Sequence, residues 1–168
     1  AELAYLRGIT ANGVFIDTTP DSDHYDSVRP DLAQITKKTI DFLMEKGHKE
    51  IGLISGTYHN PNTDEDEMDI REKMFREIMQ EKGLLNEKYI FCRRGFSVEN
   101  GYTLMSRAIQ KLGDDLPTAF FTAADPIAVG SLPLNFAFAR LVVASFAAFS
   151  VLLALATSAN AERPVAPK

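Results

Sequence analysis

The alternation of short apolar runs with segments of helical spacing constrains the fold of this chain more than any other feature. The apolar runs are GVFID (13–17), IGLIS (51–55), YIFC (89–92) and AFFTA (119–123). Uninterrupted apolar runs of this length are typical of strands that are buried on both faces, and their alternation with helices is typical of parallel sheets. The pattern predicts an α/β fold in which a parallel sheet carries helices on both faces.

Helices are predicted between these strands, because apolar residues recur there every three to four positions. The predicted helices cover 32–46 and about 70–82, a third follows Ser97, and a fourth starts at Asp125, with this residue as the N-cap before a proline. The polar segment TYHNPNTDEDEMD (57–69) is interpreted as a hydrated loop, and its acidic run favours the positive N-terminus of the helix that follows.

The strand–helix pattern stops near Leu132. In 136–156 the only charged residue is Arg140, and 141–156 is a stretch of 16 uncharged and mostly apolar residues. A membrane-spanning helix needs about 20 such residues. A basic residue, a short apolar stretch and a small-residue A-N-A are typical of an export signal, so 134–161 is interpreted as export-signal-like but misplaced. Two alternatives stay open, namely a buried or membrane-surface apolar helix and a membrane span through 136–156.

The charge of the chain is divided unevenly. Residues 134–168 carry three basic residues and one acidic residue, a net charge of +2, whereas the whole chain carries −5. The rest of the chain therefore carries −7, which indicates two segments of different origin. The one cysteine, Cys92, excludes an internal disulfide and fits a reducing compartment. No apolar run near residue 1 resembles a leader, so a cytoplasmic location is predicted.

No motif in the sequence indicates an enzyme. Neither the phosphate-binding G-x-x-x-x-G-K-[ST] pattern nor the dinucleotide-binding G-x-G-x-x-G pattern occurs. The segment DSDHYD (21–26) begins like a calcium-binding loop but lacks the required Gly and Glu, and His24, His48 and His59 do not have the spacing of metal ligands. The acidic net charge argues against non-specific nucleic-acid binding. We therefore predict a protein that is not an enzyme, with no metal and no cofactor.

Polar and aromatic residues follow the predicted strands. They are Asp17 and the segments 55–57, 93–96 and 124–125. In open parallel sheets, ligands bind beyond the carboxyl ends of the strands. Acids, bases and an aromatic ring at such a place suit a sugar, because polar groups bind the hydroxyls and the ring packs on the apolar face of the pyranose. The strand ends therefore predict a small-molecule site of the carbohydrate-binding type.

Three blocks of the sequence resemble a known family. The blocks DFLMEKGHKEIGLISG (41–56), RGFSVENGY (94–102) and PTAFFTAADPIAVGSL (117–132), in this order, resemble the effector-binding domain of the LacI/GalR transcriptional regulators. The resemblance extends over roughly 13–132. It implies a lobe of a periplasmic binding protein type I-like domain, in which a small effector, usually a sugar or a nucleobase, binds in a cleft and changes operator affinity.

The resemblance also implies four effector-binding residues. Asp17 would face the cleft, Arg71 would hydrogen-bond sugar hydroxyls, Phe96 would pack on the sugar, and Asp125 belongs to the Asn-Asp pair of the family. Ala124 stands in place of that Asn and lacks its amide. Each of the four has a purely structural alternative: the two aspartates as turn or helix caps, the arginine as an exposed helix residue, and the phenylalanine as core.

The predicted organisation has three segments. Residues 1–28 are interpreted as a remnant of an N-terminal lobe and crossover, 29–132 as an incomplete C-terminal lobe, and 133–168 as the signal-like tail, either an apolar helix or disordered. The change of pattern near 132–134 is interpreted as a junction between two unrelated sequences, so the chain is predicted to be truncated and chimeric. A sheet that lacks its last strands is expected to leave an edge unpaired.

The predicted function is the effector-binding, and more narrowly sugar-binding, portion of a LacI/GalR-type transcriptional repressor. The implied partners are a carbohydrate effector, operator DNA through a DNA-binding headpiece absent from this chain, and a second copy of the intact parent in a homodimer. The alternatives are a solute-binding protein of a sugar transport system, an enzyme on a flavodoxin-like sheet and a non-functional fusion fragment.

Overall fold

The computed structural model of the chain describes residues 2–18, 23–60, 63–135 and 142–144. The chain divides into two compact units, Ala1–Leu32 and Ala33–Lys168, and this division falls close to the boundary predicted between residues 28 and 29. Each unit is described by itself.

The described part of the first unit, residues 2–18 and 23–32, contains one helix and two short strands. They are α1 (Glu2–Ile9), β1 (Val14–Ile16) and β2 (Asp26–Val28), and the two strands pair in parallel. Tyr25 is buried here; its ring lies edge-on to Phe15, with 5.5 Å between centroids, and its hydroxyl donates to the carbonyl of Thr10 at 2.8 Å. β1 lies within the predicted strand 13–17, whereas α1 and β2 carry no periodic pattern long enough to predict them.

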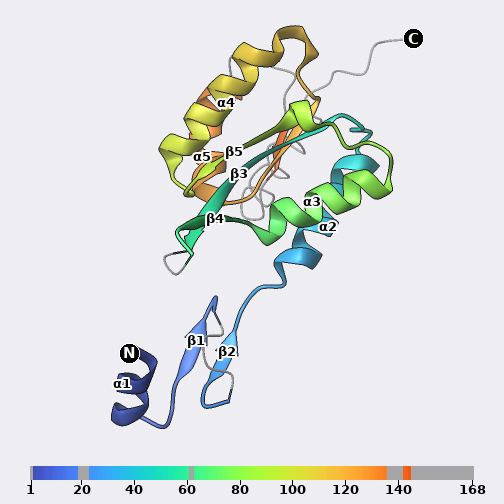
Figure 1. Ribbon diagram of the computed structural model, residues 1–168. Coiled ribbons are helices and arrows are strands. Elements are labelled where there is room, and N and C mark those ends of the chain that lie inside the picture. Colours follow the sequence, from blue (N-terminus) through green and yellow to red (C-terminus); the bar gives the residue numbers. More distant parts are fainter. Residues whose placement is uncertain (1, 19–22, 61–62, 136–141, 145–168) are drawn as a thin grey trace, which may run out of the picture. The chain divides into compact units, whose positions relative to one another are not determined.

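A five-stranded sheet forms the centre of the second unit (Figure 1). Its strands are β3 (Ile51–Asn60), β4 (Glu65–Met68), β5 (Ile90–Arg94), β6 (Ala119–Thr122) and β7 (Val142–Ala144). β3 pairs in parallel with β5 along one edge and with β6 along the other, and β6 pairs in parallel with β7. The parallel pairing predicted from the apolar runs is confirmed for β3, β5 and β6.

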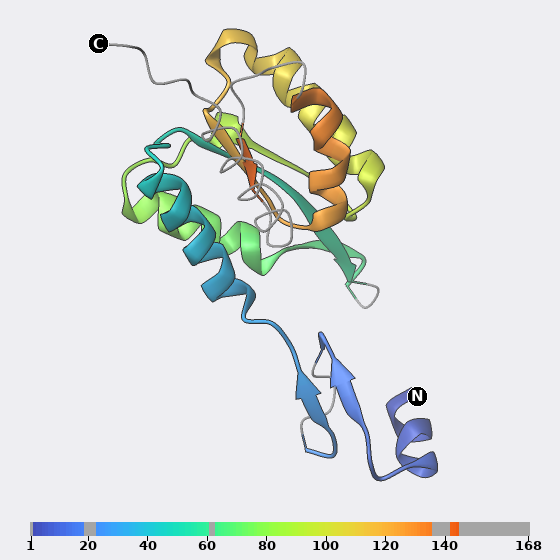
Figure 2. The same ribbon diagram turned by 180° about the vertical axis from the view of Figure 1, so that it is seen from behind.

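Helices cover both faces of this sheet (Figures 1 and 2). On one face lie α2 (Leu32–Glu45) and α3 (Ile70–Glu81), and on the other lie α4 (Val98–Leu112) and α5 (Asp125–Asn135). Two short 3₁₀ helices, η1 (Glu87–Tyr89) and η2 (Gly113–Asp115), connect elements of this unit. The predicted α/β architecture with helices on both faces is therefore confirmed.

Each face of the sheet carries its own hydrophobic cluster. The cluster beneath α2 and α3 consists of Ile40, Leu43, Ile51, Leu53, Phe75, Ile78, Met79, Ala119 and Phe121. The cluster beneath α4 and α5 consists of Ile54, Phe91, Leu104, Met105, Ala108, Phe120, Ile127 and Ala128. Successive residues of a strand thus enter opposite clusters, which is why the strands are apolar throughout and do not alternate with polar residues.

The prediction of a loop over 57–69 is wrong in part. β3 continues to Asn60, and β4 returns antiparallel to it, with Thr57 opposite Met68 and Asn60 opposite Glu65. All four residues of β4 are exposed, so the strand lacks the apolar pattern by which a strand is recognised in a sequence. The acidic run is hydrated as expected, but it is held in a hairpin by pairing with β3.

Three residues of the predicted tail belong to the sheet. Val142–Ala144 form β7, with Val143 opposite Phe120 of β6, so these residues are not the helix or disordered segment that we expected, and β6 is paired on this edge. The rest of the predicted export signal and the proposed membrane contact of 136–156 lie outside the described residues. Among the described residues, no helix combines the length and the apolar character that a membrane crossing requires.

Candidate functional site

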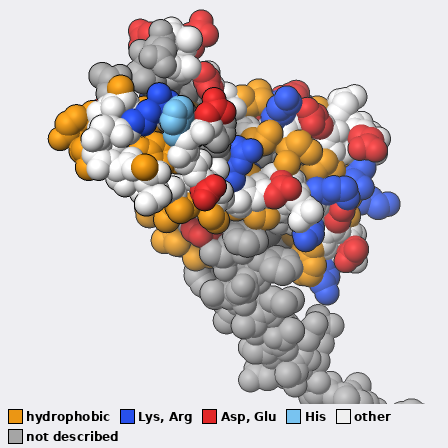
Figure 3. Space-filling model, turned by 90° about the horizontal axis from the view of Figure 1, so that it is seen from below, with side chains coloured by type: hydrophobic (Ala, Val, Ile, Leu, Met, Phe, Trp, Pro, Cys, Tyr) orange, Lys and Arg blue, Asp and Glu red, His pale blue; other side chains and the backbone are white. Residues whose placement is uncertain are grey.

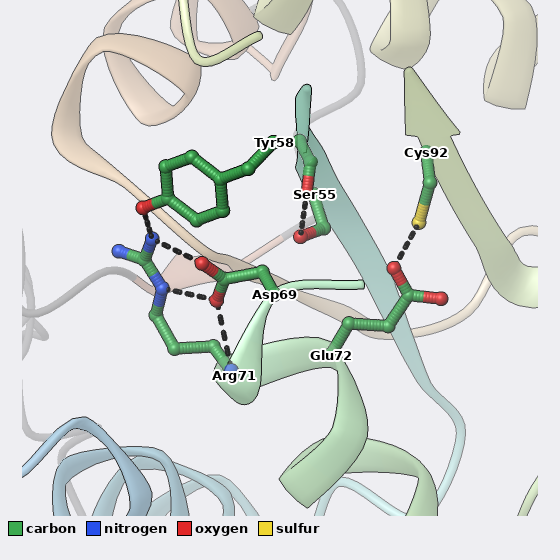
Figure 4. A network of polar contacts seen from close by, with 7 residues as sticks. Ser55, Tyr58, Asp69, Arg71, Glu72 and Cys92 are labelled. Atoms are coloured by element: carbon green, nitrogen blue, oxygen red, sulfur yellow. Dashed lines mark hydrogen bonds and ion pairs between the residues drawn. The ribbon is translucent and has the colours of Figure 1, made fainter. Parts of the chain in front are cut away.

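Arg71 is the centre of a polar and aromatic cluster beside the carboxyl end of β3 (Figure 4). Its Nε donates to Asp69 Oδ1 at 2.6 Å, and its Nη2 donates to Asp69 Oδ2 at 2.9 Å. Nη2 also donates to the hydroxyl of Tyr58 at 3.3 Å. We call Tyr58, Asp69, Arg71 and Phe96 the arginine cluster.

The start of α3 positions the ion pair of this cluster. Asp69 is the N-cap residue of α3, with extended backbone, and its Oδ1 accepts a hydrogen bond from the Arg71 backbone N–H at 2.8 Å. The same carboxylate therefore caps the helix and holds the side chain two residues later. The Asp69 side chain is 1 % exposed and the Arg71 side chain 14 %, so little water competes for these bonds.

The turn after β5 positions the aromatic part of the cluster. A Cβ on Gly56 would lie 2.3 Å from the carbonyl oxygen of Gly95, so only glycine lets β3 pack this closely against the turn. Gly95 itself has a φ of 89°, a conformation that favours glycine. The buried Asn100 donates from Nδ2 to the carbonyl of Arg94 at 2.7 Å. These contacts fix the backbone on both sides of Phe96.

Phe96 contacts both other large side chains of the cluster. The guanidinium carbon of Arg71 lies 5.2 Å from the centroid of the Phe96 ring, which is within the range of a cation–π contact. The Tyr58 and Phe96 rings lie 4.7 Å apart between centroids, tilted by 39°. The half-buried Phe96 also packs against the hydrophobic cluster beneath α4 and α5, which is the structural role left open for it. Its contact with an effector stays a prediction.

The electrostatics of the cluster follow from this pairing. Burial acts to lower the pKa of Arg71, but the hydrogen bond and the charge of Asp69 outweigh it and raise the pKa above its ordinary value. Burial, together with the negative charge of Asp69, raises the pKa of Tyr58. Arg71 therefore stays charged and Tyr58 stays a neutral phenol at physiological pH.

A second buried acid lies one helical turn along α3. Glu72 accepts a hydrogen bond from the Cys92 thiol, with 3.0 Å between Oε2 and Sγ, and another from Arg76 Nε to Oε1 at 2.9 Å. Arg76 also pairs with Glu87. Burial and the neighbouring Glu72 raise the pKa of the Cys92 thiol well above its ordinary value. Cys92 is thus a protonated residue with a structural role.

The structure brings two of the four predicted site residues together. Arg71 and Phe96 are in contact, and the small exposed fraction of Arg71 excludes the alternative that it is an ordinary surface residue. Asp17 lies in the first unit and is exposed, with a φ of 64°, and its backbone N–H donates to the carbonyl of Val28 at 2.9 Å. This bond continues the pairing of β1 with β2, so both interpretations of the Asp17 side chain stay predictions.

Asp125 is exposed and is the first residue of α5. The carbonyl of Ala124 accepts the bond from the N–H of Ala128 at 3.0 Å, so Ala124 takes the N-cap position that was predicted for Asp125. The carboxylate in the first turn still lies where the helix dipole favours a negative charge.

Two members of the arginine cluster were missed in the sequence. Tyr58 lies in the segment interpreted as a loop, and its place became visible only with the β3–β4 hairpin. The capping role of Asp69 could have been predicted, because an aspartate directly before a helical pattern is a typical N-cap. No group of His, Cys, Asp and Glu residues within the described parts of the chain has the geometry of a metal site.

Comparisons with known proteins agree with this fold. Residues 40–134 match the family model of the periplasmic binding protein-like domain. The chain is 72 % identical over 131 residues to the HTH-type transcriptional regulator GanR of Bacillus subtilis strain 168, covering 78 % of this chain and 40 % of that protein. It is 39 % identical over 133 residues to the HTH-type transcriptional regulator LacR of Lactobacillus helveticus, covering 79 % and 39 %.

Among solved structures, a LacI family transcriptional regulator from Lactobacillus casei with bound glucose aligns with a TM-score of 0.62 at 19 % identity, over 77 % of this chain and 49 % of that one. The chain thus spans about 40 % of the length of the curated relatives named above. These relatives are named as transcriptional regulators, in agreement with the prediction that this chain is not an enzyme. The match of the domain model over 40–134, together with these relatives, shows that the chain belongs to the periplasmic binding protein-like domain family and to its LacI/GalR regulator branch.

Proposed function

We propose that this chain is the effector-binding portion of a LacI/GalR-type transcriptional regulator and that it binds a carbohydrate at the arginine cluster. The observation that carries the proposal is the placement of a largely buried, fixed guanidinium against an aromatic ring beside the carboxyl end of β3. Parallel sheets of this kind bind ligands at that end. A sugar needs both parts, because its hydroxyls accept hydrogen bonds and its apolar face packs on a ring.

The arginine retains donors for such a ligand. Arginine has five N–H donors, and Asp69 and Tyr58 engage Nε and Nη2. Nη1 points away from Asp69 (Figure 4), and within the described part of the chain no acceptor takes a hydrogen bond from it. Two N–H groups in a fixed plane suit adjacent hydroxyl oxygens. Asp125, at the start of α5 in the same unit, is proposed as a further effector contact. Asp17 belongs to the first unit, and its effector contact stays a prediction from the family resemblance.

The comparisons support a regulator over a transport protein. The relatives are named as HTH-type regulators, and the structural neighbour contains glucose. We propose that operator DNA is bound by a helix-turn-helix domain of the parent and that the parent is a cytoplasmic homodimer. In Figure 3 the Lys and Arg side chains lie among Asp and Glu side chains over the coloured surface, and the acidic net charge of −5 also disfavours DNA contact by this chain.

Calorimetric titration with neutral sugars tests the proposal. The panel is glucose, galactose, lactose and sucrose, each added to the wild-type chain and to Arg71→Lys. Lysine keeps the charge but loses the planar pair of donors, so we expect binding of at least one sugar to weaken about 10-fold to 100-fold, corresponding to about 1.5–3 kcal/mol for a hydrogen bond to a charged group.

Arg107→Lys is the matched control, because Arg107 is exposed on α4 and should leave binding unchanged. Thermal unfolding of each variant shows whether the fold is retained. The proposal fails if no sugar of the panel binds, or if Arg71→Lys binds as tightly as the wild type.

A further inference from the structure

We infer that Asp69 makes the arginine cluster selective for uncharged ligands and against anionic ones. The inference rests on the proposed function and narrows it, because it names neutral sugars, and not uronates or sugar phosphates, as the class of effector. Three observations carry it: the edge of the guanidinium that Asp69 occupies, the burial of the pair, and the donors that remain for a ligand.

Asp69 occupies the edge of Arg71 with which an arginine grips an anion. Its two carboxylate oxygens accept from Nε at 2.6 Å and from Nη2 at 2.9 Å. Two parallel bonds of this kind are the usual way in which a guanidinium binds a carboxylate or a phosphate. The protein has thus placed its own carboxylate where the anionic group of a ligand would bind.

Burial makes this compensation of charge effective. With side chains only 1 % and 14 % exposed, Asp69 and Arg71 are poorly screened by water and salt. A negatively charged ligand at Nη1 would approach an arginine whose charge is already balanced, and it would be repelled by the Asp69 carboxylate. A hydroxyl oxygen carries no net charge and meets no such repulsion.

Nearby acids are engaged in pairs of their own. Glu72 accepts from Arg76 and from Cys92, and Asp66 accepts from Arg94 at 2.7 Å. Neither takes part in the contacts of Arg71. Asp69 is therefore the acid whose charge determines what Arg71 accepts.

The capping role and the charge of Asp69 can be separated by substitution. Asparagine is as good an N-cap as aspartate, so Asp69→Asn keeps the acceptor for the Arg71 backbone N–H and removes the negative charge. Asp69→Ser is a second variant that caps α3 and frees the whole Nε–Nη2 edge. Glu72→Gln is the matched control, since it also neutralises a buried acid of α3 but one that does not contact Arg71.

The first test uses inorganic phosphate and needs no sugar. The Nε–H resonance of Arg71 is followed by ¹⁵N–¹H NMR while phosphate is added to the folded chain. We expect no saturable shift for the wild type and Glu72→Gln, and a saturable shift for Asp69→Asn or Asp69→Ser, because the anion-binding edge is then open. A saturable shift in the wild type overturns the inference, and so does the absence of a shift in both folded Asp69 variants.

The second test uses three ligands that differ in charge at one position: glucose, glucuronate and glucose 6-phosphate. We expect the wild type to bind glucose at least about 10-fold more tightly than glucuronate or glucose 6-phosphate. Asp69→Asn should reduce this preference by about the same factor, because one charge-assisted contact contributes about that much to binding. Equal or tighter binding of the two anions by the wild type overturns the inference while leaving the proposed function intact. If none of the sugars binds, the proposed function fails and the phosphate titration alone decides the inference.

Discussion

At the scale of single residues, Cys92 shows how burial next to an acid sets a chemical property. Its thiol donates to Glu72, which is 3 % exposed, and ionisation would place a second negative charge beside the first. The raised pKa of this thiol means that the folded chain keeps a proton that the unfolded chain releases.

This makes stability depend on alkaline pH. The contribution of the Cys92 proton is fully present below the pKa of an unfolded thiol, about 8.5, and is lost as pH rises above it, by at most about 1.4 kcal/mol per pH unit. Urea unfolding at several pH values between 8 and 10 measures the slope. Cys92→Ala cannot titrate and should lose this part of the slope; equal slopes in the two proteins would show that Cys92 does not titrate differently on folding.

The site residues that could be predicted from the sequence are those that lie within a recognisable motif, and the site residues outside such motifs were missed. Arg71 and Phe96 were predicted because they match motif positions of a family. Tyr58 was missed because its contact with Phe96 depends on the β3–β4 hairpin, and no local pattern signals that pairing. The two roles of Asp69, as N-cap of α3 and as ion-pair partner of Arg71, could not both be predicted. A sequence can indicate an N-cap residue, but it does not show which group the second carboxylate oxygen contacts.

At the scale of elements, the contact between α4 and α5 depends on two glycines. A Cβ on Gly130 would lie 1.9 Å from the carbonyl oxygen of Val98, and one on Gly101 would lie 2.1 Å from that of Ile127. Both obstacles are backbone atoms, which cannot move aside as a side chain can. The two helices therefore approach more closely than any other residue at these positions would permit.

Gly130→Ala should consequently destabilise the chain. Because the added methyl group must push the helices apart, we expect the free energy of unfolding to fall by about 1–3 kcal/mol, measured as a lower urea midpoint. Gly8→Ala in α1 is the control, since a Cβ added at Gly8 would have nothing within 4 Å and alanine favours helix. Equal midpoints for Gly130→Ala and the wild type would contradict the close approach.

The elements that the sequence predicted well share one property, which is burial on both faces. β3, β5 and β6 were recognised because their residues enter two hydrophobic clusters and are apolar without interruption. β4 was missed because it is exposed throughout and is held by backbone pairing with β3, which does not require an apolar pattern. The residues of β7 were predicted to be part of an apolar helix or a disordered tail. A short apolar stretch has the same composition in a strand, a helix and an export signal, so the sequence alone does not distinguish them.

At the scale of the whole molecule, the sheet of the second unit contains strands from both sides of the predicted junction near 132–134. Residues 40–134 match the periplasmic binding protein-like domain, and Val142–Ala144, from the stretch interpreted as signal-like, pair with β6. The ladder hydrogen bonds of a sheet join backbone groups, so this pairing does not depend on the origin of the segment. The structure divides the chain into two compact units. The three segments 1–28, 29–132 and 133–168 concern the origin of the sequence and stay a prediction.

The most direct test of carbohydrate binding at the arginine cluster uses the absence of tryptophan from the chain. In Phe96→Trp, the one indole would report on the ring position itself, next to Arg71. We predict a saturable change in its fluorescence with a neutral sugar of the panel, and its loss when Arg71→Lys is added to the same chain. Emission that stays unchanged with every sugar, in a variant that remains folded, would contradict carbohydrate binding at this site.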